Sequence, residues 1–275
     1  MQRLDRRRAS GEMNPRSTGR SPGFIEFVIL IALIISLVAL SIDAMLPALP
    51  EIAADLGVQQ INDSQYVISI FFAGMAFGQI FFGPLSDSIG RRPSIISGFA
   101  VFALGCLLSI LAADFEQMLL GRFLQGLGAS GPRIVSIALV RDQFKGREMA
   151  RVMSFVMTVF ILVPVFAPAV GQLILKLASW HWIFAMFLAL VLIVVSWFWL
   201  RQPETLARKN RIKFSFFKLA LDIQAILRNR AALGYTLTMG FIFGAFLGYL
   251  SSSQQIFQIQ YQLFDLFPLY FGILA

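Results

Sequence analysis

Long apolar stretches are the feature that most constrains the fold of this chain. A helix that crosses a bilayer needs roughly 20 such residues, and seven stretches meet this length while an eighth begins near residue 266. They lie near residues 24–46, 64–85, 94–113, 117–140, 149–175, 182–200 and 232–250. Because lipid cannot hydrogen-bond to free backbone N–H and C=O groups, segments that span it must be helices. The sequence therefore predicts an all-α polytopic membrane protein.

The basic residues are gathered in a few places. Of the 23 Lys and Arg residues, 20 lie before residue 23, at 91–92, in 141–151 and in 201–230. Counting the spans puts all four places on one side of the membrane, and basic loops stay in the cytoplasm. We therefore expect a cytoplasmic N-terminus. The net charge of +8 reflects membrane orientation, and we expect no nucleic-acid partner.

Few residue types suited to catalysis are present. Cys106 is the only cysteine and His181 the only histidine, which excludes a disulfide framework and a multi-histidine metal site. There is also no Gly-Lys phosphate loop of the kind that drives ATP-dependent pumps. The sequence therefore argues against an enzyme, and we expect no metal and no cofactor.

The pattern of spans divides the chain into four parts. Residues 1–23 form a basic cytoplasmic tail, 24–200 a six-helix transmembrane bundle, 201–230 a cytoplasmic linker and 231–275 the start of a second bundle. A helix that crosses only half of the bilayer would leave unsatisfied backbone groups in hydrocarbon. We therefore expect this sequence to be the N-terminal piece of a longer protein.

Within the linker, apolar residues recur at helical spacing at Phe214, Phe217, Leu221 and Ala225. This pattern favours an amphipathic helix on the cytoplasmic face of the membrane. A solvated linker with little helix is the alternative.

Among the charged residues inside predicted spans, three stand out: Asp43, Arg122 and Arg133. Insertion of a charge costs ~2.5–3.5 kcal/mol, which makes such residues functional candidates. At about 1.5 Å per residue, Asp43 and Arg122 are expected at the same depth, where they can meet. Burial disfavours a charged carboxylate and a nearby arginine favours it, so Asp43 can load and release a proton. The alternative is a static ion pair that only holds two helices together.

The fourth span is also expected to line a cavity. Arg133 follows Arg122 by 11 residues, which places both on one face of a helix with 3.6 residues per turn. Gly126 and Ala129 lie between them on that face and leave it open. We therefore place Arg133, Gln125, Gly126 and Ala129 in the wall of a cavity.

A short polar hairpin, Gly-Pro-Leu-Ser-Asp-Ser-Ile-Gly-Arg-Arg-Pro at residues 83–93, joins the second and third spans. Its first glycine allows close packing, its second can adopt a positive φ, and its aspartate can pair with an arginine or face a helix N-terminus. The residues of this hairpin that we expect to be functional are Gly83, Asp87, Gly90, Arg91 and Arg92. The alternative is that the two arginines only anchor the hairpin at the membrane surface.

Several motifs resemble one transporter family. Residues 121–128 resemble the span-four motif of proton-coupled members of the major facilitator superfamily, and 83–93 the loop between its second and third spans. Residues 41–50 resemble the end of span one in the Bcr/CflA drug-resistance exporters. The pair Arg141-Asp142 and residues 149–154 and 203–205 are similar to the same group.

This resemblance covers almost the whole chain and carries several expectations. It implies the major facilitator fold, with a complete N-terminal six-helix bundle and the first one to two helices of the C-terminal bundle, whose remainder is missing. It implies that Asp43 and Arg122 couple transport to protons, and that the 83–93 hairpin is a cytoplasmic latch between the two halves. It also implies a bacterial inner membrane.

The fifth span contains two prolines, Pro164 and Pro168, followed by Gly171. Each proline removes a backbone donor and bends the helix, and Gly171 permits close helix approach. The segment is similar to the antiporter motif of the family, although Val163 stands in place of the first glycine. A kinked helix that serves only packing is the alternative.

Together these features favour a secondary active transporter. It would export small, largely hydrophobic drugs or metabolites in exchange for protons by alternating access, with H⁺ as the coupling ion. A non-transporting membrane fragment or interaction protein, and a facilitator with a non-drug metabolite as substrate, stay open as alternatives. The sequence does not identify the substrate.

Overall fold

The computed structural model describes residues 22–263 and 266–274, and in these ranges the chain is helical without a strand. The long helices are α2 (Phe24–Asp43), α4 (Tyr66–Ile89), α5 (Arg91–Ile110), α6 (Phe115–Gln143), α7 (Gly146–Leu177), α8 (His181–Arg201) and α10 (Arg230–Gln254). The shorter elements are η1 (Leu46–Ala48), α3 (Leu49–Asp55), η2 (Ile61–Gln65), η3 (Arg208–Asn210), α9 (Phe216–Arg228), η4 (Gln255–Gln260) and α11 (Phe267–Leu274). Within the described residues, seven helical segments are long and apolar enough to cross a membrane. The predicted all-α polytopic fold class is confirmed.

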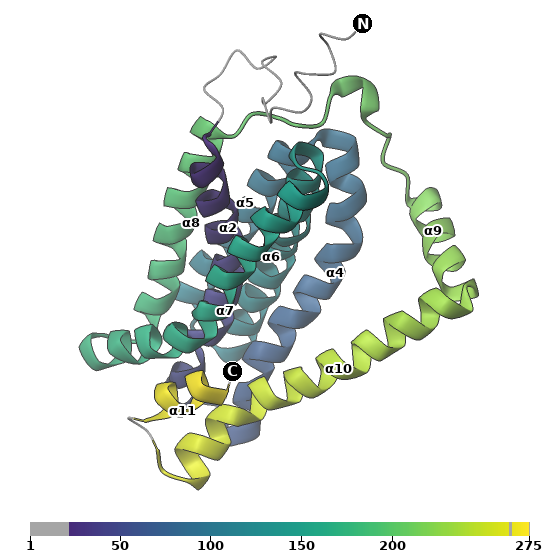
Figure 1. Cartoon of the computed structure of the whole chain (residues 1–275). Coiled ribbons are helices and arrows are strands. Elements are labelled where there is room, and N and C mark those ends of the chain that lie inside the picture. Colours follow the sequence, from purple (N-terminus) through teal and green to yellow (C-terminus); the bar gives the residue numbers. More distant parts are fainter. Residues whose placement is uncertain (1–21, 264–265, 275) are drawn as a thin grey trace, which may run out of the picture.

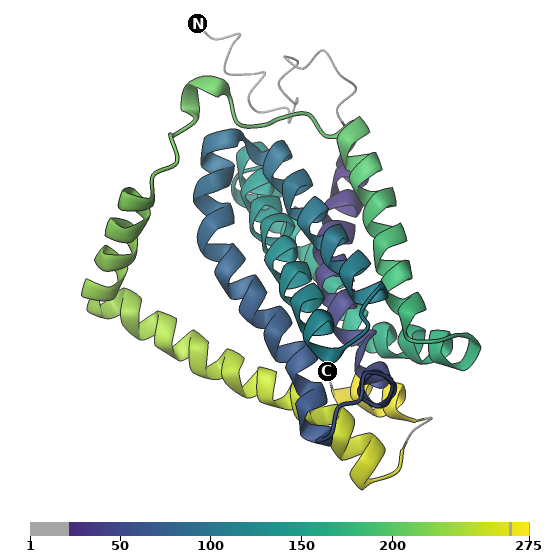
Figure 2. The same cartoon turned by 180° about the vertical axis from the view of Figure 1, so that it is seen from behind.

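The first six long helices form one bundle, shown in Figures 1 and 2. Helices α4, α5 and α6 pack on one another, and α2 packs against α7 and α8. Contacts of α5 with α8 and of α2 with α6 join the two groups. The core of the protein therefore lies in this bundle, and most of the predicted basic tail, residues 1–23, falls outside the described residues.

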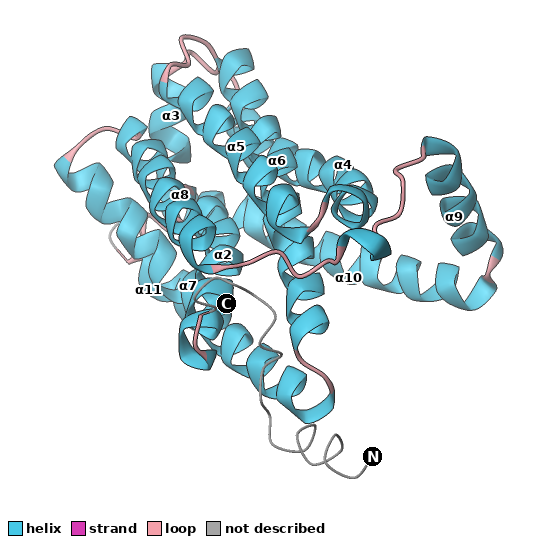
Figure 3. Ribbon diagram, turned by 90° about the horizontal axis from the view of Figure 1, so that it is seen from above, coloured by secondary structure: helices cyan, strands magenta, loops and turns pink. Residues whose placement is uncertain are grey.

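The last three helices are placed differently. Helix α10 leaves the bundle at a slant, touching α4 near one end and α9 at the other, and Figure 3 shows α9 standing apart from the bundle. Helix α11 packs on α7. No side chain of α9 is buried, and in α10 only Leu250, Ser253 and Gln254 are. Helix α9 and most of α10 thus lie outside the core of the bundle, whereas α11 buries Phe267, Pro268 and Phe271.

The linker contains the helix that its apolar spacing predicts. Helix α9 begins after Ser215, whose side chain accepts a hydrogen bond from the backbone N–H of Lys218 at 3.3 Å, which is the usual role of serine at a helix N-cap. Phe217, Leu221 and Ala225 lie in this helix, whereas Phe214 precedes it. The prediction was therefore right about the helix and wrong about its first apolar residue.

The segment at residues 83–93 is helical rather than an open hairpin. Helix α4 continues through Pro84 to Ile89, and α5 begins at Arg91. Only Gly90 interrupts the two, with φ of 114° and ψ of 164°. A residue with a side chain is strained at this positive φ, so the geometry agrees with the prediction that this turn requires glycine.

Helix α6 approaches α4 so closely that only glycine fits at the contact. A Cβ atom at Gly126 would overlap the carbonyl oxygen of Phe71, and one at Gly74 would overlap that of Phe123. Gly83 is different, because a Cβ atom there would meet no atom within 4 Å. The expectation that Gly83 allows close packing is therefore wrong in this structure.

We predict that Gly126→Ala lowers the free energy of unfolding by about 1–3 kcal/mol, the usual cost of overpacking. The backbone of Phe71 must move to admit the methyl group. Thermal unfolding of the detergent-purified protein measures the effect. Gly83→Ala is the matched control on a neighbouring helix and should be neutral or slightly stabilising, since alanine is the better helix former. Equal stability of the two variants would contradict the packing described here.

Candidate functional site

A cavity of about 380 Å³ lies between the bundle and α10. Its wall contains two charged residues, Asp43 on α2 and Arg133 on α6. The rest of the wall is apolar and consists of Ile35, Val38, Ala39, Ile42, Phe72, Phe160, Pro164, Met239, Ile242, Phe243, Phe246 and Leu250. Such a concave apolar site with a few polar groups is typical of small-molecule binding.

Asp43 is the last residue of α2 and is 5% exposed. Within the described part of the chain, its carboxylate makes no hydrogen bond and no ion pair. Tyr249 on α10 lies within electrostatic reach of this carboxylate, and its buried hydroxyl has no hydrogen-bond partner among the described residues. Asp43 is therefore a buried carboxylate with no partner among the described residues.

Arg122 is fully buried at the junction of several helices. Its guanidinium donates to the carbonyl of Val67 on α4 at 3.1 Å and to the carbonyl of Ser41 on α2 at 3.2 Å. It also donates to Gln125 Oε1 on its own helix at 2.6 Å, and Gln125 Nε2 donates to Ser109 Oγ on α5. The guanidinium carbon lies 4.5 Å from the centre of the Phe71 ring. Neutral oxygens and an aromatic face thus hold this charge.

The expected meeting of Asp43 and Arg122 occurs only in part. Arg122 reaches the carbonyl of Ser41, two residues before Asp43, but the described structure contains no ion pair between the two side chains. Arg122 is also absent from the wall of the cavity. A static Asp–Arg pair, the alternative considered from sequence, is therefore not what joins α2 to α6.

The predicted lining of the cavity by α6 is right for Arg133 alone. Gln125 lies between Arg122 and Ser109, and Gly126 lies against the backbone of α4. Ala129 is completely buried and also lies outside the cavity wall. These three predictions were wrong because α4 and α5 cover the face of α6 that was expected to be open.

Helix α7 brings its two prolines and Gly171 to different places. Pro164 lines the cavity, and Pro168 is buried within the bundle. At Gly171 a Cβ atom would overlap the carbonyl oxygen of Ala44, so the glycine permits close contact just beyond the end of α2. Figure 1 shows α7 bending in its second half, as prolines inside a helix predict.

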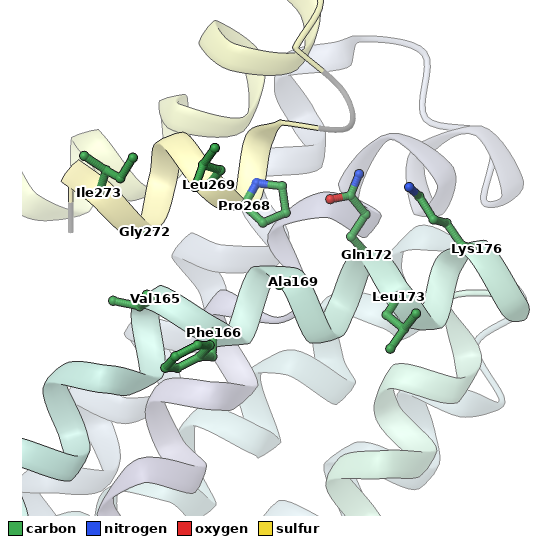
Figure 4. A pocket seen from close by; sticks show the side chains of 10 residues that line it. All are labelled: Val165, Phe166, Ala169, Gln172, Leu173, Lys176, Pro268, Leu269, Gly272 and Ile273. Carbon is green, nitrogen blue, oxygen red and sulfur yellow. The ribbon is translucent and has the colours of Figure 1, made fainter.

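A second, wider cavity of about 500 Å³ lies between α7 and α11 (Figure 4). Its wall is mostly apolar and includes Phe166, Leu173 and Ile273, with Gln172 and Lys176 toward one end. It contains no carboxylate. The cavity at Asp43 is therefore the better candidate site. Among the described residues, no group of three or more His, Cys, Asp or Glu side chains is placed to hold a metal ion.

At the opposite end of the bundle, Arg91 is the centre of a polar network. Only 6% exposed, it donates to Asp87 Oδ1 at 2.5 Å, to Ser86 Oγ at 2.7 Å and to Asp142 Oδ2 at 3.0 Å. The predicted local pairing of Asp87 with Arg91 is therefore present. The burial of Arg91 does not fit the alternative of simple anchoring at lipid headgroups.

Glu204, which follows α8, caps the start of α5. Its two carboxylate oxygens accept hydrogen bonds from the backbone N–H groups of Arg91 at 3.0 Å and Arg92 at 3.1 Å. A negative charge at a helix N-terminus also interacts favourably with the helix dipole. A Cβ atom on Gly90 would overlap Glu204 Oε2, so the glycine makes room for the cap. Arg92 itself donates to the carbonyl of Trp199 and lies over its ring.

Sequence reasoning missed the cap by Glu204 and the contact of Asp142 with Arg91. Both residues belong to motifs that were noticed only for their resemblance to a family. The aromatic wall and Tyr249 were also missed, because 28 phenylalanines offered no signal that distinguishes a cavity wall from a lipid-facing surface.

We predict that Glu204→Ala lowers the free energy of unfolding by about 1–3 kcal/mol, because it leaves the first N–H groups of α5 without an acceptor. Glu204→Gln should restore part of the loss through its amide oxygen. Glu148→Ala, which removes an exposed acid from the first turn of α7, is the control for charge. Thermal unfolding in detergent compares them, and equal stability of Glu204→Ala and Glu148→Ala would rule out the cap.

Comparison with known proteins connects this geometry to a family. The model of the Major Facilitator Superfamily matches residues 31–275. An uncharacterized MFS-type transporter, YdgK of Bacillus subtilis, is 35% identical, with 85% of this chain and 59% of that protein covered. A bicyclomycin resistance protein homolog of Haemophilus influenzae is 32% identical, with 84% of this chain and 58% of that protein covered. The chain thus spans somewhat more than half the length of these relatives.

The fold is also found in solved structures. The crystal structure of the human organic anion transporter MFSD10 has a TM-score of 0.63 at 20% identity, covering 92% of this chain and 70% of that one. At this identity the likeness concerns the fold alone. The family model, which matches residues 31–275, shows that the chain belongs to the Major Facilitator Superfamily, a family of membrane transporters and not of enzymes.

Proposed function

We propose that this chain is part of a proton-coupled transporter that exports small, largely hydrophobic compounds by alternating access. The observation that carries the proposal is Asp43, a buried carboxylate that has no partner among the described residues and lies in the wall of an apolar cavity. The chain's likeness to a bicyclomycin resistance protein homolog supports a drug as one substrate.

In this proposal Asp43 is the residue at which proton and substrate compete. An isolated buried carboxylate is costly and is relieved either by a proton or by a donor group on a ligand. Because both use the same oxygens, binding of one releases the other. This exchange couples export of the compound to import of a proton.

Arg122 has a supporting role in the same step. It holds the backbone of Ser41 and so fixes the end of α2 next to Asp43. Its Nη2 atom has no hydrogen-bond partner among the described residues. That donor is free to interact with the carboxylate of Asp43 when the helices shift between conformations.

We also assign the polar network around Arg91 to conformational control. It joins the ends of α4, α5 and α6 and the segment after α8. A network of this kind keeps one cytoplasmic surface rigid, against which the second half of a transporter can close. We place that surface in the cytoplasm, because basic loops stay there and the basic segments at 83–93 and 141–151 meet the start of the linker through Asp142 and Glu204. We place the protein in a bacterial inner membrane because of its similarity to bacterial relatives.

We predict that Asp43→Asn abolishes proton-driven transport. The complete reading frame is expressed, and bicyclomycin uptake into everted membrane vesicles is measured with and without an imposed pH gradient. The wild type should accumulate the compound in response to the gradient, and the variant should lose this response by at least about tenfold, since asparagine cannot exchange a proton.

Asp43→Glu should retain part of the response. Glu51→Gln, which neutralises an exposed acid beyond the end of α2, should behave as the wild type. An unchanged pH dependence in Asp43→Asn would place coupling at another group and contradict this role.

A further inference from the structure

The cavity at Asp43 contains a second charge that the proton-coupling step does not use. Arg133 lines the same cavity and is partly buried. Its hydrogen bond within the described structure is to the sulfur of Met75 at 3.7 Å, and a thioether is a weak acceptor. A guanidinium has five N–H donors in a fixed planar fork. Most of the hydrogen-bonding capacity of Arg133 is therefore unused.

The two charges lie at different heights in the cavity. Arg122 lies at about the level of Asp43 along the bundle, because its guanidinium donates to the carbonyl of Ser41, two residues before Asp43, and to the carbonyl of Val67. Arg133 contacts Met75, eight residues further along α4 than Val67. At about 1.5 Å per residue, this places the Arg133 contact roughly 12 Å from the level of Asp43, toward the end of the bundle that carries Arg91.

Apart from these two charges, the wall of the cavity is apolar. Phe72 and Phe160 come from the bundle, and Phe243 and Phe246 from α10. Phe72 and Phe243 both line the cavity and contact each other edge to face, with ring centroids 5.7 Å apart. Such a surface favours an aromatic or aliphatic middle section in a ligand, with polar groups only at its two ends.

We propose that the cavity selects elongated compounds with a hydrogen-bond donor or amine at one end and an electron-rich acceptor, such as a nitro, carbonyl or carboxylate group, at the other. The donor end faces Asp43, the acceptor end faces the fork of Arg133, and the aromatic wall holds the section between them. Arg133 is thus a specificity-determining residue that favours an acceptor and disfavours a cation at its end. This inference rests on the proposed function, because it concerns the substrate of the same cavity.

The test uses three amines that differ in one terminal group: para-nitrophenylbutylamine, para-methylphenylbutylamine and para-trimethylammoniophenylbutylamine. The affinity of each for the purified product of the complete reading frame is measured by isothermal titration calorimetry. The wild type should bind the nitro compound about tenfold more tightly than the methyl compound, which corresponds to about 1.4 kcal/mol, and the trimethylammonio compound most weakly.

Arg133→Gln should reduce the nitro-to-methyl preference to within about twofold and improve binding of the trimethylammonio compound. Arg133→Lys should give an intermediate preference, because it keeps the charge and loses the fork, and it serves as the second variant if Arg133→Gln does not fold. Arg147→Gln removes an exposed arginine from the first turn of α7 and should keep the wild-type preference. Asp43→Asn should weaken all three amines while the nitro-to-methyl ratio persists.

Two results separate this inference from the proposed function. If Arg133→Gln changes all three affinities equally while the wild type still transports bicyclomycin, the role of Arg133 is overturned and the transporter proposal stands. If the wild type neither binds these amines nor transports bicyclomycin, both proposals are overturned.

Discussion

The structure depends on how a membrane bundle satisfies a charge that it has buried. Arg122 has no access to water, so its donors depend on acceptors within the protein, and all but Nη2 find them among the described residues. It finds them on α2, on α4 and, through Gln125, toward α5. One guanidinium therefore ties the first third of α6 to three neighbouring helices. Because it uses the carbonyl of Ser41 and not the carboxylate of Asp43, it fixes the position of Asp43 without neutralising it.

The two ends of the bundle treat their charges in opposite ways. Around Arg91, every charged partner is supplied by the protein, from Asp87, Asp142 and the cap at Glu204. Around the cavity, Asp43 and Arg133 have no charged partner among the described residues. Charges that are paired within the protein stabilise a rigid surface, whereas charges without a partner are available to a proton or a ligand. This contrast locates structural support at one end and binding chemistry at the other.

The sequence was sufficient for the parts of the fold that depend on composition and local pattern. Hydropathy predicted the spans, because lipid admits only helices there, and the cost of burying charge identified Asp43, Arg122 and Arg133. It was insufficient where distant segments meet. The cap of α5 by Glu204 joins residues 113 positions apart, and helical periodicity alone could not tell that α4 and α5 cover the face of α6 at Gly126. The same limit explains why Arg133 was the one residue of its predicted group to line the cavity.

The central claim is that proton and substrate compete for the carboxylate of Asp43. Infrared difference spectroscopy of the purified protein tests it most directly, because a protonated carboxyl group has a carbonyl stretching band that a carboxylate lacks. We expect para-nitrophenylbutylamine to abolish such a band in the wild type, with no corresponding change in Asp43→Asn. The same loss in both proteins, or binding without any change in this band, would contradict the claim.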